Sequence, residues 1–253
     1  KTSVARFGRA RPAQIVSPSP SKPWHAMAPS GSSITLYHCE AARSFRVLWT
    51  LKELGIKGYR LVTMPFPPRF LAEGYTKINV LGTIPYFVDG DTKMTESCGA
   101  PMYLVEKYGP SPLKVAPDEP DFGSYLNWIT HADATLTFPQ TVFLRFCVQE
   151  PKKGLTEAGI AYAKWFIARL RLLDQTLSDG REFLCSGRFT IADIVVTYAL
   201  WLGNSLGLDK RFGPYKPQTN AYMDRMMSRA AFLEAREEEK ASLVAWQEGR
   251  SKL

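Results

Sequence analysis

The chain has 253 residues, of which 45% are hydrophobic and 22% charged, a composition typical of a globular protein with one large or two modest cores. No apolar run approaches the roughly 20 residues that a membrane-spanning helix needs. The net charge is +8, but the first 33 positions hold five basic and no acidic residues. The rest of the chain holds 27 basic against 24 acidic residues, a balance that does not indicate a nucleic-acid-binding protein.

The cysteines and histidines are few and widely spaced. Cys39, Cys98, Cys147 and Cys185 form no C-x-x-C pair, which argues against structural zinc and a dithiol motif. The three histidines, His25, His38 and His131, are too few and too far apart for an obvious metal site, so we expect no metal. Scattered free cysteines are typical of a reducing compartment, so we expect a cytoplasmic location. The alternative location is the peroxisome, because the chain ends in the import signal Ser251-Lys252-Leu253.

Residues 1–32 are rich in Pro, Ser, Arg and Ala and show no hydrophobic periodicity. We predict that this segment is disordered. Its basic, acid-free composition resembles a transit peptide. The alternative, which we favour, is an upstream extension with translation starting at Met27.

Strand and helix patterns alternate over residues 33–110. Short β-prone runs predict strands at 34–37, 59–63, 85–88 and 93–95. Apolar residues at helical spacing predict a helix over 43–54, which Gly55 ends. A loop is expected at 66–68 and a second helix over 97–108. The resulting order, β-α-β, loop, β-β-α, is that of a thioredoxin-like fold.

The segment 81–90, LGTIPYFVDG, places a proline directly before a short apolar strand. Pro85 suits the first residue of a strand because it has no N–H. If the Ile84–Pro85 bond is cis, the bend turns the backbone of Ile84 outward, where it can pair with an extended peptide.

Glu96 and Ser97 precede the second predicted helix. There the Ser97 hydroxyl and the free N–H groups of the helix start suit a carboxylate, and Glu96 suits an ammonium group. Together with the Ile84–Pro85 peptide, they predict a site for a small zwitterionic peptide. Pro101 lies within this helix, so an irregular helix start is expected to shift Glu96 and Ser97.

Four prolines lie between positions 110 and 120, and we predict that residues 111–119 are a linker. The pattern over 120–253 is largely helical. One helix face is predicted from the spacing of Tyr162, Phe166, Leu170, Leu173 and Leu177. Thr190 and Asp193 predict a capping box at the start of a further helix. His131 is expected to be an ordinary hydrogen-bonded helix residue.

Five segments in one order resemble a glutathione transferase, and the resemblance covers about residues 34–245. They are ITLY at 34–37, RSFRVLWTLKELGI at 43–56, NVLGTIPYFVDG at 79–90, TES at 95–97 and GRFTIADI at 187–194. The resemblance implies an α/β thioredoxin-like N-terminal domain over 33–110 and an all-α C-terminal domain over 120–253, the glutathione transferase fold. The pattern is more similar to bacterial-type transferases than to the tyrosine-dependent animal classes.

The resemblance also implies that glutathione binds along the first domain as a co-substrate. Ile84 would pair its main chain with the cysteinyl part of glutathione, with Pro85 cis and Thr83 beside this surface. Glu96 and Ser97 would hold the γ-glutamyl end.

Catalysis in this family lowers the pKa of the glutathione thiol, because the thiolate is the nucleophile. Aligning on the first strand places Cys39 near the cysteine of glutaredoxin-like classes, whereas aligning on the helix places Ala41 where many relatives carry the active serine or cysteine. We favour Ser44 in the first turn of the helix as the thiol-activating residue. Arg43 would assist by charge, and Cys39 is the competing candidate.

The first hypothesis is a transferase that uses glutathione to attack a small apolar electrophile bound between the domains, and the resemblance implies that it is a homodimer. The aromatic-rich stretch 125–146 is expected to line that electrophile site. One alternative is a glutathione-dependent thiol transferase or peroxidase that uses Cys39. Another is a non-catalytic carrier of apolar ligands with the same fold. The sequence does not identify the natural electrophile.

Overall fold

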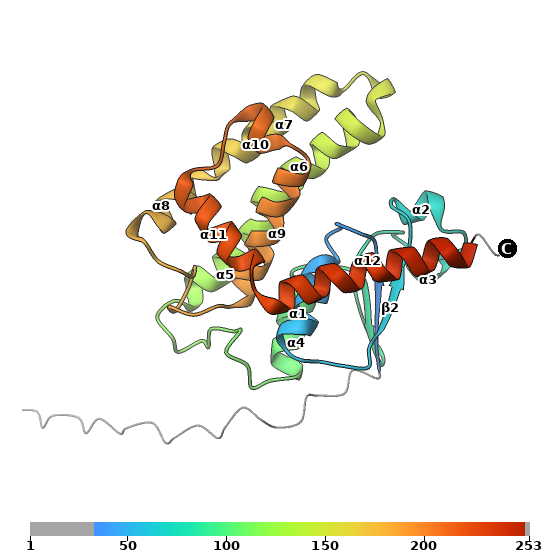
Figure 1. The fold of residues 1–253 in the computed structure, drawn as a ribbon, viewed down its shortest axis with the longest axis horizontal. Coiled ribbons are helices and arrows are strands. Elements are labelled where there is room, and N and C mark those ends of the chain that lie inside the picture. Colours follow the sequence, from blue (N-terminus) through green and yellow to red (C-terminus); the bar gives the residue numbers. More distant parts are fainter. Residues whose placement is uncertain (1–32, 251–253) are drawn as a thin grey trace, which may run out of the picture.

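The computed structural model describes residues 33–250, which form an α/β part followed by a helical part (Figure 1). Several predictions lie outside the described residues. They are the disordered extension and its two interpretations at 1–32, and the import signal at 251–253.

The N-terminal part contains the four predicted strands and the two predicted helices. Two further short helices, α2 and α3, follow the predicted loop. The elements are β1 (Ile34–His38), α1 (Phe45–Glu53), β2 (Arg60–Thr63), α2 (Pro68–Leu71), α3 (Tyr75–Ile78), β3 (Tyr86–Asp89), β4 (Thr92–Met94) and α4 (Gly99–Lys107).

The four strands form one mixed sheet in the order β2-β1-β3-β4. β1 and β2 are parallel and joined through α1, whereas β1–β3 and β3–β4 are antiparallel. Leu36 and Phe87 are fully buried in the sheet, as are Val47 and Leu48 on α1. This sheet confirms the predicted thioredoxin-like domain.

The C-terminal part is entirely helical, as predicted, and residues 108–121 before it contain no helix or strand. Its α-helices are α5 (Phe122–His131), α6 (Phe138–Phe143), α7 (Thr156–Arg169), α8 (Arg171–Thr176), α9 (Ile191–Ser205), α10 (Leu208–Phe212), α11 (Pro217–Met227) and α12 (Ala230–Arg250). Two π-helical segments, η1 (Ala132–Thr137) and η2 (Leu144–Gln149), continue α5 and α6. None of the helices described is long and apolar enough to span a bilayer.

Helix α9 is the most deeply buried helix of this part, and the predicted capping box begins it. The Thr190 N–H donates to the Asp193 carboxylate at 2.9 Å. The Tyr222 hydroxyl donates to the same carboxylate at 2.9 Å, so the buried charge is well hydrogen-bonded.

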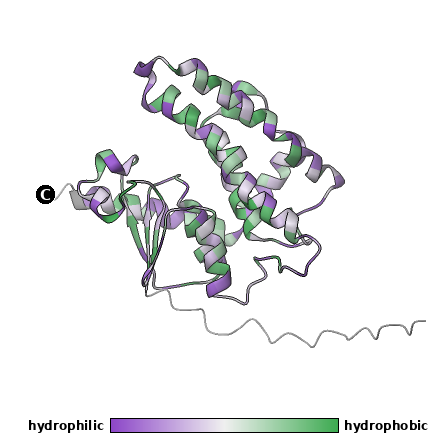
Figure 2. Ribbon diagram, turned by 180° about the vertical axis from the view of Figure 1, so that it is seen from behind, coloured by the Kyte–Doolittle hydropathy of each residue, from purple (hydrophilic) through white to green (hydrophobic). Residues whose placement is uncertain are grey.

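Hydrophobic and hydrophilic residues alternate along the helices of the C-terminal part, as expected for helices with one buried face (Figure 2).

Helix α12 leaves the helical part and packs back onto the N-terminal part beside α1 and β2 (Figure 1). Phe232 packs edge-on against Phe45 and Trp49 of α1, with ring centroids 5.3 and 5.0 Å apart. The Thr63 and Ser242 hydroxyls lie 2.6 Å apart. Helix α12 therefore contacts strand β2 of the N-terminal sheet.

Candidate active site

Three loop segments meet at one end of the sheet. The strand register pairs Tyr37 with Tyr86 and Phe87 with Met94. Consequently the loop after β1, the residues before β3 and the residues after β4 all leave the sheet at the same end. The Ile84–Pro85 bond at this end is cis, as predicted.

A cleft of about 370 Å³ lies at this end, between the sheet and the helical part. Its first wall consists of residues 40–43 of the β1–α1 loop, residues 66–69 and residues 82–84. Its second wall consists of Thr141, Leu144, Tyr198, Leu202, Ser205 and Leu206. The second wall is mainly apolar, and two of its residues come from the stretch 125–146. The aromatic side chains of that stretch do not line the cleft.

The predicted peptide-binding residues divide into two groups. Thr83 and Ile84 line the cleft, whereas Pro85 is buried and does not line it. Glu96 and Ser97 lie at the same end of the sheet but outside the cleft lining. Glu96 is exposed, whereas Ser97 is buried and accepts a hydrogen bond of 2.7 Å from the Arg46 guanidinium.

The predicted start of the second helix was wrong by two residues, because α4 begins at Gly99 rather than at Ser97. This later start places Pro101 in the first turn, where the missing N–H removes no intrahelical hydrogen bond. The irregular helix start that we expected from Pro101 is therefore not required.

Helix α3, which the sequence did not predict, holds in place the residues just before β3. The Tyr75 hydroxyl donates to the Thr83 carbonyl oxygen at 2.8 Å, and the Asn79 amide donates to the same oxygen at 2.9 Å. Both side chains come from within eight residues of Thr83. In the sequence, the only signal for these contacts was that a tyrosine and an asparagine shortly precede Ile84–Pro85.

Cys39 and Ser44 both lie beneath the cleft wall and not on it. Each side chain is fully buried, and neither residue is part of the cleft lining. Burial raises the pKa of the Cys39 thiol to about 12, so this thiol is protonated at neutral pH. Ser44 occupies the N-cap position of α1, but its hydroxyl makes no cap hydrogen bond.

The Ser44 hydroxyl instead belongs to a buried chain of three polar side chains. Ser44 Oγ lies 2.8 Å from His38 Nδ1, and His38 Nε2 lies 3.0 Å from Glu239 Oε2 of α12. The distances resemble those of a serine–histidine–carboxylate triad. All three residues are 0% exposed, so no substrate reaches the serine and we interpret the chain as structural. Glu239 was missed because about 200 residues separate it from His38.

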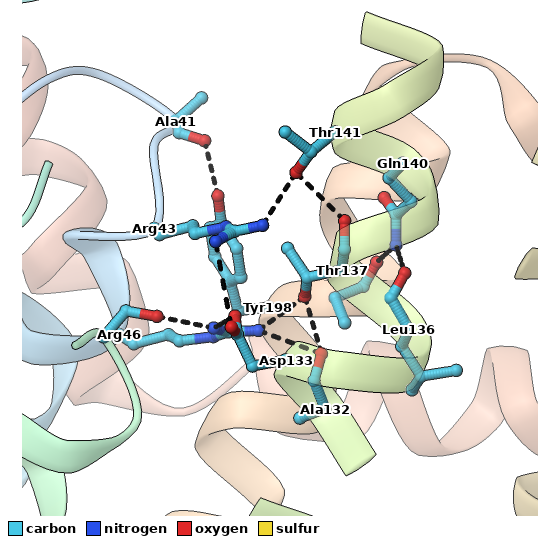
Figure 3. Close-up of polar contacts among 12 residues, drawn as sticks. Ala41, Arg43, Arg46, Ala132, Asp133, Leu136, Thr137, Gln140, Thr141 and Tyr198 are labelled. Carbon is cyan, nitrogen blue, oxygen red and sulfur yellow. Dashed lines mark hydrogen bonds and ion pairs between the residues drawn. The ribbon is translucent and has the colours of Figure 1, made fainter. Parts of the chain in front are cut away.

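Arg43 of the β1–α1 loop and Arg46 of the first turn of α1 meet the helical part at Asp133 (Figure 3). Arg43 lines the cleft, donates to the Thr141 hydroxyl at 2.7 Å and lies 3.7 Å from the Asp133 carboxylate. Arg46 is fully buried and donates to Asp133 at 2.8 Å and to Thr137 at 2.6 Å. Burial opposes ionisation of Asp133, but the two guanidinium groups prevail and lower its pKa.

A second cavity, of about 450 Å³, is lined only by residues of the helical part, from α5, η1, α6, α7 and α8. His131 lines it, and within the described residues its buried Nε2 has no hydrogen-bond partner. The prediction of a hydrogen-bonded histidine was therefore wrong. Nowhere in residues 33–250 do three or more His, Cys, Asp or Glu residues gather as they would around a metal ion.

Comparison with known proteins gives matches along most of the chain. Residues 32–106 match the model of the glutathione S-transferase N-terminal domain, and residues 167–230 match that of the C-terminal domain. Glutathione S-transferase 3 of Schizosaccharomyces pombe is 28% identical over 200 residues, covering 72% of this chain and 78% of the relative.

Solved structures show the same fold. A glutathione transferase of Phanerochaete chrysosporium in complex with oxidized glutathione is 25% identical, with a TM-score of 0.68 over 84% of this chain and 98% of the other. A further protein of that fungus, cocrystallized with 1-(S-glutathionyl)-2,4-dinitrobenzene, is 22% identical, with a TM-score of 0.70 over 84% and 96%. With its mixed four-stranded sheet, its helical second part and both matching domain models, the chain belongs to the glutathione S-transferase family.

Proposed function

We propose that this protein is a glutathione transferase that activates the glutathione thiol for attack on a small apolar electrophile. The observation that carries the proposal is the cleft itself. One wall contains Ile84 and Arg43, and the other wall is a mainly apolar helix surface. The first wall suits a charged peptide and the second suits an apolar electrophile.

Glutathione would lie along the first wall. Its cysteinyl part would pair with the Ile84 main chain beside Thr83 and Pro85, and its γ-glutamyl end would extend toward Glu96 and Ser97. The common position of these segments at one end of the sheet supports this pose. Glutathione in the solved structures of relatives supports it further.

Arg43 is the strongest candidate for stabilising the thiolate. Its guanidinium lines the cleft near the N-terminus of α1, where the helix dipole also favours negative charge. The thiol loses its proton to solvent, and the sulfur then attacks the electrophile and displaces its leaving group. Ser44 and Cys39 were predicted for this role, but their burial beneath the wall supports Arg43 instead.

The size of the cleft supports a small electrophile. About 370 Å³ is near the lower end of the usual range for ligand sites, roughly 300–1,000 Å³, and part of it would hold the thiol end of glutathione. In the remaining part of the cleft, Leu144, Leu202 and Leu206 would contact the electrophile.

The test is turnover by the purified protein with glutathione and each of three substrates. We expect conjugation of 1-chloro-2,4-dinitrobenzene. Reduction of hydroxyethyl disulfide or of cumene hydroperoxide, lost on Cys39→Ser, would instead support the thiol transferase or peroxidase alternative. Tight glutathione binding with no turnover of any substrate would contradict the enzyme proposal and support the carrier alternative.

A further inference from the structure

Glu239 is a fully buried carboxylate that reaches the cleft loop from the last helix of the chain. Its Oε2 atom lies 3.0 Å from the Ala41 backbone nitrogen and 3.0 Å from His38 Nε2. Its other oxygen pairs with the guanidinium of Arg236. A buried carboxylate is costly unless it is paired and hydrogen-bonded, and these partners satisfy both oxygens.

Ala41 has a backbone conformation that needs such support. Its φ is +55°, in the left-handed region that is unfavourable for a residue with a Cβ atom. Its N–H donates to Glu239, and its carbonyl oxygen accepts a hydrogen bond of 3.1 Å from the Tyr198 hydroxyl. A strained conformation persists when the surrounding structure holds it from several sides, and here two side chains hold one residue.

The same carboxylate also fixes both ends of the loop. Because His38 Nε2 faces Glu239, this nitrogen carries the proton, and Nδ1 accepts from the Ser44 hydroxyl. Ser44 Oγ in turn accepts a hydrogen bond of 3.4 Å from the Cys39 N–H. Glu239 thus acts on the loop at Ala41 directly and at Cys39 and Ser44 through His38.

We propose that Glu239 is a positioning residue for the thiol site. Its carboxylate holds residues 39–44 in the conformation that places Arg43 on the cleft wall, beside the N-terminus of α1. Glu239 itself does not line the cleft, so it acts through the loop and not on the substrate. The inference rests on the proposed function for its catalytic consequence but not for the loop anchor itself.

Hydrogen–deuterium exchange of residues 39–44 tests the anchor without any assay of activity. Glu239→Leu removes the acceptor, and Glu239→Asp keeps the charge but shortens the side chain, so it guards against a leucine variant that fails to fold. We expect exchange in this segment to rise about 10- to 100-fold in both, as for the loss of one charge-assisted hydrogen bond. Glu239→Gln keeps one oxygen acceptor for the Ala41 N–H but loses the ion pair with Arg236, so its exchange should rise less than in the other two variants. Unchanged exchange in both Glu239→Leu and Glu239→Asp would overturn the proposal.

Turnover then tests the link to catalysis. We expect kcat for 1-chloro-2,4-dinitrobenzene to fall about 10- to 100-fold in Glu239→Leu and Glu239→Asp, because small misplacements of a reacting group have effects of that size. The KM for the electrophile should change little, and the pH–rate profile should move to higher pH as the thiolate loses stabilisation. Glu239→Gln, which keeps one acceptor for the Ala41 N–H, should retain more of the rate than the other two variants.

Glu238→Gln is the matched control, because Glu238 neighbours Glu239 on α12 but pairs with Lys52 and Tyr59 outside the loop. It should lower the melting temperature without changing kcat or the pH profile. Faster loop exchange with wild-type turnover would overturn the catalytic role of Glu239. A wild-type protein with no turnover would contradict the proposed function alone, since the exchange measurement would still report on the anchor.

Discussion

The two sides of the cleft's first wall lie at the same end of one sheet, yet they are held in different ways. The peptide side, residues 82–85, is fixed locally, since Tyr75 and Asn79 hold the Thr83 carbonyl from within eight residues. The thiol side, residues 39–44, is fixed by Tyr198 and Glu239, which are 157 and 198 residues away from Ala41. The conformation of the peptide side thus depends on nearby residues, whereas that of the thiol side depends on residues far away in the sequence.

Arg43→Ala should have the largest effect, on the thiol side. Removing the only cation of the loop 39–44 that lines the cleft should lower kcat/KM about 100-fold, the size expected when one preorganised group that stabilises developing charge is lost. Steady-state kinetics with glutathione and 1-chloro-2,4-dinitrobenzene measures this. Arg43→Lys is the control and should retain more activity than the alanine variant. A rate within a few-fold of wild type in Arg43→Ala would remove Arg43 from the mechanism.

His38→Gln tests the buried layer beneath the loop through the pH dependence of stability. Burial lowers the pKa of His38 in the folded protein from 6.5 to about 4. Below about pH 6.5 the unfolded chain therefore binds a proton that the folded protein does not bind until about pH 4.

Acidification from pH 7 to pH 5 should thus remove about 2 kcal/mol of unfolding free energy from the wild type, and His38→Gln should lack this contribution. Urea denaturation of both proteins at the two pH values measures the difference. Equal losses in the two proteins would show that His38 is accessible to protons in the folded state.

Ser44→Ala separates a structural role from a catalytic role on the thiol side. The substitution leaves His38 Nδ1 without its partner, which should lower the unfolding free energy by about 1–2 kcal/mol. Because Ser44 does not line the cleft, kcat/KM should stay within a few-fold of wild type. A loss of activity as large as that of Arg43→Ala would instead restore Ser44 as the thiol-activating residue.

Glu96→Gln should have the smallest effect. Glu96 lies beyond the peptide side of the cleft and does not line it. Weaker attraction for the ammonium group of glutathione should raise the KM for glutathione by several-fold and leave kcat unchanged, the pattern of a lost uniform binding contact. Glu157→Gln, exposed on α7, is the matched control and should change neither constant. A fall in kcat in Glu96→Gln would mean that the γ-glutamyl end contributes to the chemical step.

The order of strands and helices in the N-terminal part was predictable because its signals are local. Alternating strand patterns, the helical spacing before Gly55 and the proline before β3 each act over a few residues. The Thr190–Asp193 capping box was predictable for the same reason, since its residues are three positions apart.

The thiol side was not predictable from the sequence. Nothing near Ser44 indicates that its hydroxyl turns inward to His38, because the partner that orients His38 is Glu239. Glu239 is one of three consecutive glutamates at 237–239 in a charged helix, and only the packing of α12 against α1 and β2 buries this one. The short helices α2 and α3 were missed because four-residue helices are too short to show a hydrophobic period.

The most direct test is the ionisation of glutathione bound to the wild-type protein, followed by the ultraviolet absorption of its thiolate as pH is varied. We predict that the bound thiol ionises at least about one pH unit below the free thiol, whose pKa is about 8.5, and that Arg43→Ala abolishes most of this shift. Saturated binding with an unshifted thiol pKa would contradict thiol activation by this protein, and the absence of any binding at millimolar glutathione would contradict the proposed glutathione site.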